Sequence, residues 1–353
     1  MTIPDEVDII ICGGGSSGCV PAGRLANLDH NLQVLLIEAG EDNLNNPWAN
    51  VFQMYTRASA SDYDDFQAKG WTTKELIPLM KKHETYQRAC NNRDLHGFDG
   101  PIKVSFGNYT YPIMQDFLRA AESQGIPVTD DLQDLKTGYG LQDIASPSRR
   151  SDAAHAYVHS TRAKYTNLHL KCNTKVDKII IEDGRAVGVA TVPTKPLDGR
   201  NPPRKIFRAR KQIIVSSGTL SSPLILQRSG IGEPEKLRKA GIKPLVNLPG
   251  VGRNFQDHYL TFSVYRAKPD VESFDDFVRG DPEVQKKVFE EWNLKGTGPL
   301  ATNGIDAGVK IRPTPEELEE MKRWPTPEFT SGWESYFKNK PDKPVMHYSI
   351  ISG

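Results

Sequence analysis

The distribution of apolar residues near the N-terminus predicts a strand, a turn, a helix and a second strand within 40 residues. An apolar run ends at Cys12 and is followed by a glycine-rich segment, Gly13–Gly18. A helix-compatible stretch comes next, and a second apolar run, Leu32–Ile37, ends at the acidic residue Glu38. Uninterrupted apolar runs of this length are typical of strands buried on both faces of a parallel sheet. This order of elements indicates the start of an α/β fold.

The rest of the chain alternates between helical and strand-like patterns. The predicted helices are a capped start at 61–66, an amphipathic stretch at 73–82, and segments at 111–124, 151–164 and 220–229. The predicted strands are 168–172, 176–184, 186–192, 205–209 and 211–215. An Asp-Gly pair at 183–184 predicts a hairpin turn. We therefore expect an α/β fold with a Rossmann-like parallel sheet and an antiparallel meander.

The spacing of the glycines predicts a dinucleotide site. Gly13 would allow a tight turn, Gly15 would let a pyrophosphate approach the backbone, and Gly18 would let the helix pack closely on the strand. The helix N-terminus would present free N–H groups and a partial positive charge to the phosphates. Glu38 follows Gly18 by 20 residues and would accept hydrogen bonds from a ribose diol, which disfavours a 2′-phosphate. The alternative, a structural turn that binds nothing, does not account for an acid after so apolar a strand.

A second turn of small residues follows a later apolar strand. Ser216–Thr219 comes directly after the predicted strand 211–215. Ligands of α/β sheets sit beyond the carboxyl ends of parallel strands, so this turn can face the same ligand as the first.

Size and charge limit the classes of function. A chain of 353 residues exceeds the roughly 250–300 residues of a single core, so two domains are expected. With 45 basic and 44 acidic residues, the net charge is +1. The composition therefore shows no excess of positive charge of the kind that binds nucleic acid or an anionic membrane. The acidic N-terminus does not resemble a signal peptide, and no apolar run reaches membrane-spanning length. The scattered cysteines predict reduced thiols in an intracellular protein; they are Cys12, Cys19, Cys90 and Cys172.

Two groups of side chains could suggest a metal, but each has a simpler interpretation. Asp62, Asp64 and Asp65 suit the first turn of a helix. His155 and His159 lie four residues apart on one predicted helix, without a Glu-x-x-His pattern or an obvious third ligand. We expect no metal site.

Two later segments carry a specific resemblance to a known family. Gly218–Gly232 and Asn247–His258 resemble signature segments of the glucose–methanol–choline oxidoreductases, which are FAD enzymes. The N-terminal glycine turn and Glu38 also fit this family. The likeness covers almost the whole chain and extends in particular to the peroxisomal alcohol (methanol) oxidases. The stretches that carry it are 23–30, 43–48, 55–67, 274–280, 296–304 and 343–351.

The resemblance implies that the cofactor is FAD and assigns roles to residues of this chain. Glu38 would bind the adenosine ribose, and the backbone at Val176 would contact adenine. The turn at Ser217 and Gly218 would close over the dinucleotide. The residues implied for the pyrophosphate are Gly13, Gly15, Ser16, Ser17 and Gly18.

The implied reaction is the oxidation of a short primary alcohol such as methanol to an aldehyde, with O2 reduced to H2O2. A base removes the hydroxyl proton while a hydride moves from carbon to flavin N5. The implied domains are an FAD-binding domain at 1–262, with a helical insertion at about 53–165, and an incomplete α+β substrate-binding domain at 263–353. The complete relatives form large homo-oligomers in peroxisomes, to which a C-terminal signal directs them.

The chain departs from the family pattern in two ways. A few dozen residues of the family have no counterpart between Trp48 and Ala49, and a smaller gap falls near 143–149. The catalytic histidine and its partner lie beyond the position that Gly353 matches. We expect neither His258 nor His347 to replace them, so no catalytic residue is assigned and the chain is expected to be inactive alone.

Two alternatives remain open. The chain could be a catalytically silent FAD-binding or oligomer-assembly fragment. It could also be an NAD-dependent dehydrogenase, which shares the first glycine turn but not the segment at 218–232.

Overall fold

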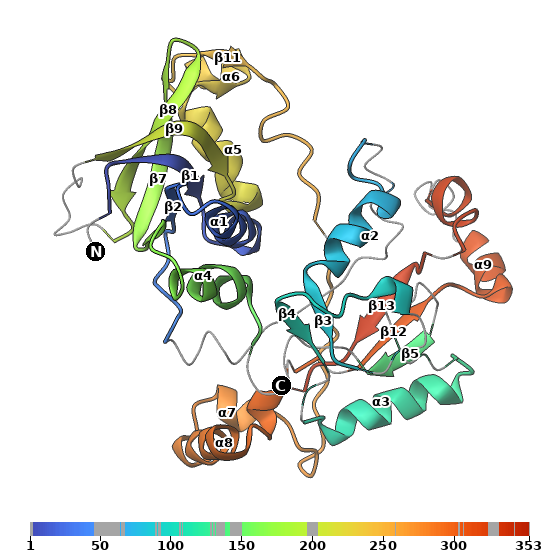
Figure 1. Ribbon diagram of the computed structural model, residues 1–353. Coiled ribbons are helices and arrows are strands. Elements are labelled where there is room, and N and C mark those ends of the chain that lie inside the picture. The colour runs from blue at the N-terminus through green and yellow to red at the C-terminus, as the bar shows by residue number, and fades with distance from the viewer. Residues whose placement is uncertain are drawn as a thin grey trace. The chain divides into compact units, whose positions relative to one another are not determined.

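A computed structural model describes most of the chain as two compact units (Figure 1). The first unit lies within 1–46 and 152–264, and the second lies within 47–151 and 265–353. The described residues are 3–45, 64, 68–88, 90, 93–105, 107, 109–127, 129, 131, 138–141, 150–195, 204–257, 259–302, 304–305, 307–323, 332–341 and 343–352.

A six-stranded mixed sheet forms the centre of the first unit, in the order β6-β2-β1-β9-β8-β7. Neighbouring strands from β6 to β9 are parallel, whereas β9, β8 and β7 form an antiparallel meander. The predicted α/β fold with both kinds of pairing is therefore confirmed. The strands are β1 (Glu6–Cys12), β2 (Val34–Ile37), β6 (Leu168–Lys171), β7 (Thr174–Glu182), β8 (Arg185–Pro193) and β9 (Lys205–Val215).

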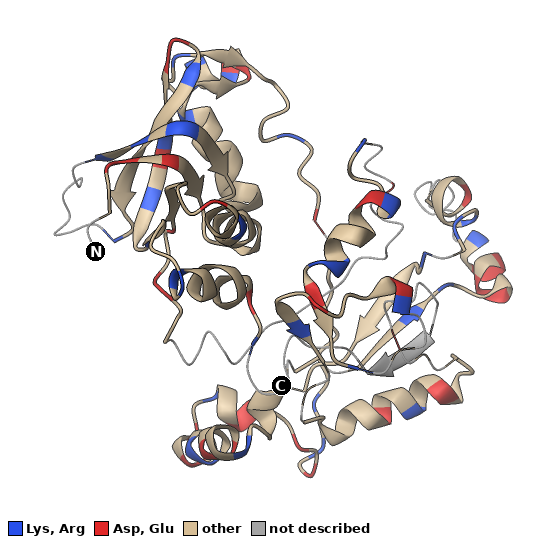
Figure 2. Ribbon diagram, viewed as in Figure 1, with Lys and Arg blue, Asp and Glu red and all other residues tan. Residues whose placement is uncertain are grey.

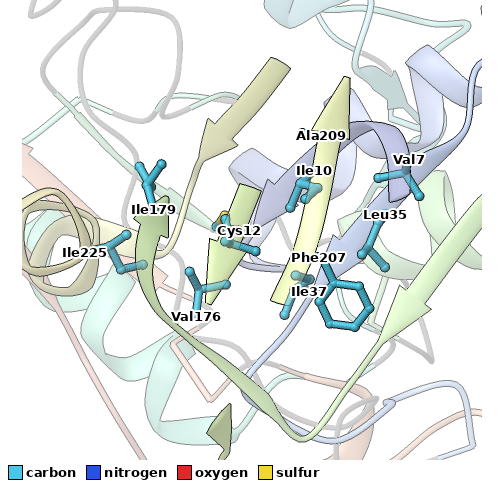
Figure 3. Packing of buried hydrophobic residues seen from close by; sticks show 11 residues of the cluster. Val7, Ile10, Cys12, Leu35, Ile37, Val176, Ile179, Phe207, Ala209 and Ile225 are labelled. Carbon is cyan, nitrogen blue, oxygen red and sulfur yellow. The ribbon is translucent and has the colours of Figure 1, made fainter. Parts of the chain in front are cut away.

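Helices cover both faces of this sheet, which explains why residues 9–12 of β1 and all of β2 are apolar. Helix α1 (Ser16–Leu28) and the π-helix at Ala154–His159 pack on one face with Ile9, Ile11 and the alternate residues of β2. Helix α5 (Gly218–Arg228) packs on the other face through Ile225 (Figure 3). The remaining short elements of this unit are α4 (Ser160–Arg162), α6 (Pro234–Lys239), β10 (Ile231–Gly232) and β11 (Val246–Asn247).

The hairpin between β7 and β8 forms at the predicted Asp-Gly pair. Asp183 has φ 49° and Gly184 has φ 75°, the two positive values that a two-residue turn between antiparallel strands favours. Glu182 lies opposite Arg185 beside this turn, and the register of the two strands shifts between Ile181 and Ile180 and again between Lys178 and Val176.

The expected break between strands 205–209 and 211–215 is wrong, because β9 is one continuous strand. Its first part pairs antiparallel with β8 and its last part pairs parallel with β1. Arg210, which suggested an interruption, donates to Asp8 Oδ1 at 3.1 Å, and its guanidinium also lies 3.3 Å from Glu6 Oε2. These ion pairs let a charged residue continue the strand.

The second unit combines short sheets with several helices. Strands β13 (Met346–Ser349), β12 (Ala307–Ile311) and β5 (Gly138–Leu141) form an antiparallel sheet, and β3 (Glu84–Tyr86) pairs in parallel with β4 (Ile102–Val104). Two helices were predicted here at nearly the same bounds, α2 (Thr73–Lys81) and α3 (Pro112–Ser123). The others are α7 (Asp275–Val278), α8 (Pro282–Lys295) and α9 (Pro315–Lys322), with 3-10 turns at Arg93–Leu95 and Pro299–Ala301 and a π-helix at Trp333–Phe337.

Both units carry basic and acidic residues on their described elements (Figure 2). The balance differs between elements: β9 has four basic residues and no acid, whereas the helix at Pro315–Lys322 has four acids and one lysine. Among the described residues, no helix combines the length and apolar character that crossing a bilayer would require. The division at 262 and the insertion at about 53–165 stay predictions.

Candidate dinucleotide-binding site

The turn after β1 is held by close contacts that require glycine. Gly13 has φ +109°, and its N–H donates to Ile37 O at 2.8 Å. A Cβ at Gly13 would lie 2.5 Å from Ser216 O, and a Cβ at Gly18 would lie 1.9 Å from Gly13 O. The chain therefore leaves β1 in a conformation and at a packing distance that a side chain would prevent.

Gly15 lies in open space, in contrast to these two glycines. A Cβ built there meets no atom within 4 Å, and Gly15 is exposed together with Ser16 and Ser17. Its φ of −73° and ψ of −174° are ordinary for any residue. The absence of a side chain at Gly15 thus leaves room above the backbone rather than relieving a clash within the fold.

The N-terminus of α1 offers N–H groups to this open space. Gly15 is the N-cap, and none of the described side chains caps the helix or places an acid in its first turn. The N–H groups of Gly15, Ser16 and Ser17 have no acceptor among the described residues. Three donors at the positive end of a 13-residue helix make a cradle suited to an anion.

Glu38 connects the end of β2 to the glycine turn. Its Oε2 accepts from Gly14 N at 2.6 Å, and its Oε1 accepts from Gly40 N at 2.7 Å. Each carboxylate oxygen can accept more than one hydrogen bond, so capacity remains for a diol. The sequence indicated that Glu38 would bind a ribose, but gave no sign that it also holds Gly14.

The start of β7 lies beside Glu38. Thr174 N donates to Glu38 O at 3.0 Å, and Asn173 N donates to Gly40 O at 2.8 Å. Val176 follows on β7, where its side chain is buried in the core (Figure 3). The side chain of Val176 is therefore not available to a ligand, and the contact of its backbone with adenine, which the resemblance implies, stays a prediction.

The second small-residue turn is attached to the end of β1. Ser216 N and Ser217 Oγ both donate to Cys12 O, at 2.8 and 2.7 Å. Gly218 has φ +83° and begins α5, and a Cβ there would meet no atom within 4 Å. The two turns thus lie side by side at the carboxyl ends of the neighbouring parallel strands β1 and β9.

The cysteines near this site are unreactive thiols. Burial raises the pKa of Cys12 and of Cys19 to about 12, and burial together with Asp42 and Glu38 raises that of Cys172 to about 11. All four cysteines are free, as expected from the sequence. Near neutral pH these three thiols are protonated and do not act as nucleophiles.

The histidines that the sequence raised as possible metal ligands or catalytic residues have other contacts where the structure describes them. His155 Nδ1 lies 2.9 Å from Asp152 Oδ2 and His159 Nε2 lies 3.0 Å from Asn43 Oδ1, and the described residues contain no metal-binding cluster. Burial, with Lys310 adding to it, lowers the pKa of His347 on β13 to about 4, so this imidazole is neutral. His258 lies outside the described residues, as do Asp62 and Asp65, whereas Asp64 accepts from Thr73 N at 2.8 Å.

Comparison with known proteins identifies the family. The model of the GMC (glucose–methanol–choline) oxidoreductases, described as "GMC oxidoreductase", matches residues 7–260. The chain belongs to the GMC oxidoreductase family. It is 62% identical over 404 residues to alcohol oxidase 1 of Komagataella phaffii and 59% identical over 404 residues to an alcohol oxidase of Candida boidinii. Both alignments include all of this chain and 60% of the relative, so the chain spans about 60% of the length of these alcohol oxidases.

A curated protein of lower identity and two solved structures also match this chain, and the solved structures share its fold. An oxygen-dependent choline dehydrogenase of Burkholderia thailandensis is 31% identical over 374 residues, covering 91% of this chain and 63% of that protein. Formate oxidase of Aspergillus oryzae has a TM-score of 0.80 at 20% identity, covering 100% of this chain and 69% of that one. A fungal aryl-alcohol oxidase has a TM-score of 0.75 at 19% identity, covering 99% and 73%.

The alignment also confirms that this GMC family member is internally shortened. It runs over 404 residues, whereas the chain has 353, so at least 51 positions of the Komagataella relative have no counterpart here. The gaps predicted after Trp48 and near 143–149 fall outside the described residues, and their placement stays a prediction.

Proposed function

We propose that the first unit binds FAD in the cradle at the N-terminus of α1, between the glycine turn after β1 and the small-residue turn after β9. The observation that carries this proposal is the set of three N–H groups at Gly15, Ser16 and Ser17 beside an open space. These groups would hold the pyrophosphate, Glu38 the adenosine ribose, and the backbone at Val176 the adenine. Ser217 and Gly218 would close the cradle from the second turn, at which α5 begins.

FAD is favoured over NAD by the family and by the second turn. A dehydrogenase of the NAD-dependent class would share only the first turn, whereas the family match continues to residue 260. When bound, FAD supplies the capacity to accept a hydride and to pass two electrons to O2. The contribution of the described residues is to bind and orient the dinucleotide; none of them is assigned as a catalytic base.

The proposed reaction of the complete enzyme is oxidation of a short primary alcohol such as methanol, with O2 as the electron acceptor. This proposal rests on the 57–62% identity to proteins named alcohol oxidase. A peroxisomal location and homo-oligomeric assembly are proposed on the same likeness. A fluorescent fusion would test the first and sedimentation the second.

A binding titration tests the cofactor. Purified chain is mixed with FAD or NAD while protein fluorescence and flavin absorbance are followed. We expect saturable binding of FAD, a yellow protein after gel filtration, and no comparable binding of NAD. A folded chain that stays colourless and takes up no FAD would overturn the proposal, and a colourless chain that binds NAD would favour the dehydrogenase.

A turnover assay separates the oxidase from a silent fragment. The FAD-loaded chain is given methanol and O2, and peroxide is measured beside Komagataella alcohol oxidase. Peroxide at a comparable rate would show that the chain is an oxidase by itself. FAD binding without peroxide would favour the silent module, for which the exposed apolar segment at 259–264 provides an assembly surface. Co-purification with the intact relative would then support an assembly role.

A further inference from the structure

Ser216 occupies the point where the two turns of the cradle meet. It follows β9 directly, and its N–H donates to Cys12 O. Its hydroxyl lies 3.1 Å from Gly13 O and 3.2 Å from Cys12 O. A Cβ at Gly18 would lie 2.7 Å from this hydroxyl, so Ser216 is packed against both glycines that the fold requires.

The hydroxyl of Ser216 matters more to Gly13 than to Cys12. A serine hydroxyl has one proton to donate. Cys12 O already accepts from Ser216 N and from Ser217 Oγ, whereas Gly13 O has no other hydrogen-bond donor among the described residues. Without this hydroxyl, Gly13 O would be left without a donor.

Ser216 and Glu38 hold the two ends of one peptide group. Gly13 C=O and Gly14 N–H belong to the same peptide plane. Ser216 Oγ donates to its oxygen at 3.1 Å, and Glu38 Oε2 accepts from its N–H at 2.6 Å. A peptide between two glycines rotates with little steric resistance. Its orientation, which determines the direction of the backbone entering Gly15, therefore depends on these two side chains.

We propose that Ser216 is a positioning residue for the diphosphate of the cofactor. It does not touch the ligand; it fixes the Gly13–Gly14 peptide so that the N–H groups from Gly15 to Ser17 converge on one anion. This inference rests on the proposed function, because it concerns the same cradle. It adds a residue that follows β9 and lies more than 200 positions from the turn that it holds.

The test compares Ser216→Ala with a matched loss of a buried hydroxyl. Ser229 Oγ, at the other end of α5, donates to Ile225 O at 2.6 Å and accepts from Ile179 N at 2.8 Å. Affinities for FAD, ADP and adenosine are measured for both variants, together with the melting temperature without ligand. Adenosine contains the ribose and the base but no diphosphate, so it reports on the rest of the site.

Ser216→Ala is expected to weaken FAD and ADP binding roughly threefold to tenfold, the effect of losing one hydrogen bond. Adenosine binding is expected to stay unchanged, and Ser229→Ala is expected to lower the melting temperature without changing any affinity. If Ser216→Ala does not fold, Ser216→Cys keeps the packing but offers only a weak donor, and the same selective loss is expected.

Unchanged FAD and ADP affinity in folded Ser216→Ala would overturn this inference while leaving the proposed function intact. An equal loss for adenosine would also overturn it, because the effect would then be a general loosening of the unit. Wild-type chain that binds neither FAD nor ADP would overturn the proposed function, and with it the inference.

Discussion

Gly15 and Gly18 lie three residues apart, yet their surroundings predict opposite outcomes of substitution. Gly15→Val adds a side chain to open space in a permitted backbone conformation, so the fold is expected to persist. FAD affinity is expected to fall at least about tenfold, or ~1.4 kcal/mol, because the side chain occupies the space proposed for the pyrophosphate. Circular dichroism and a flavin titration check the two expectations. Unchanged FAD loading in this variant would contradict the proposed cradle.

Gly18→Ala serves as the contrasting variant. Its Cβ would approach Gly13 O to 1.9 Å, a distance that forces α1 away from the strand. We expect a loss of stability of at least about 1–3 kcal/mol, typical of overpacking in a core, measured by urea unfolding without any ligand. A stable Gly18→Ala protein would show that α1 can shift at no cost.

Glu38 combines ribose recognition with support of the turn, so its loss should affect more than one ligand. Glu38→Ala is expected to weaken FAD binding by roughly 1–3 kcal/mol, the scale for hydrogen bonds to a charged group. Adenosine should weaken as well, since it carries the ribose diol; this distinguishes Glu38 from Ser216. Isothermal titration measures both, and an unchanged adenosine affinity would show that Glu38 only holds Gly14 and Gly40.

At the scale of residues, the sequence predicted the local part of the site. The spacing that predicted the site lies within one strand–helix–strand unit and involves Gly13, Gly15, Gly18 and Glu38. The bond from Glu38 to Gly14 spans 24 residues and that from Ser216 to Gly13 spans 203. Such contacts depend on which strands become neighbours, and no pattern in the sequence specifies that a serine after β9 meets a glycine after β1.

At the scale of elements, the predictions succeeded where a pattern was continuous and failed where charge interrupted it. The hairpin at Asp183–Gly184 and helices α2 and α3 were located nearly to the residue. The 11 residues of β9 were predicted as two strands, 205–209 and 211–215, separated at Arg210; the same strand also carries Arg208 and Lys211. Their partners lie on β1 and β7, which the sequence alone does not bring alongside.

A buried histidine links β3 to later segments and makes the second unit sensitive to alkaline pH. His96 lies between Glu84, with Nδ1 3.2 Å from Oε2, and Asp131, with Nε2 2.7 Å from Oδ2. Burial opposes its charge, but the hydrogen bonds to Asp131 and Glu84 outweigh this and raise its pKa to about 9. Because the pKa of His96 is higher in the folded than in the unfolded chain, its protonated form stabilises the fold. This contribution to the free energy of unfolding is fully present below pH 6.5 and is lost as the pH rises toward 9.

We therefore expect the free energy of unfolding to fall between pH 6.5 and 9, as measured by urea titration. His96→Gln should remove this dependence and destabilise the chain by roughly 1–3 kcal/mol at pH 6, the scale for losing hydrogen bonds to charged groups, since it removes the imidazolium that pairs with Glu84 and Asp131. A pH dependence that is the same in both proteins would show that another group is responsible.

At the scale of the whole molecule, each unit is assembled from two separate segments, and the chain passes from one unit to the other three times, the last time near residue 264. The residues just before this point expose large apolar side chains: Tyr259 is 104% exposed, Phe262 63% and Val264 91%. Large apolar side chains exposed in close succession favour association with another surface.

The exposed segment predicts self-association of the isolated chain. Light scattering is expected to rise with concentration, and a Phe262→Ser, Val264→Ser double variant should reduce it severalfold. Leu28→Ser, which removes an isolated side chain 78% exposed at the end of α1, is the control and should have little effect. Equal scattering from all three proteins would place the association elsewhere.

The pairing of β1 with β9 has a consequence for biosynthesis. Strand β1 emerges from the ribosome among the first dozen residues, but its second neighbour begins only at Lys205. Until then, one edge of β1 has no partner, and the glycine turn has no serine to fix it. A nascent chain released before residue 216 should therefore fail to retain flavin, even though it already carries the entire N-terminal fingerprint.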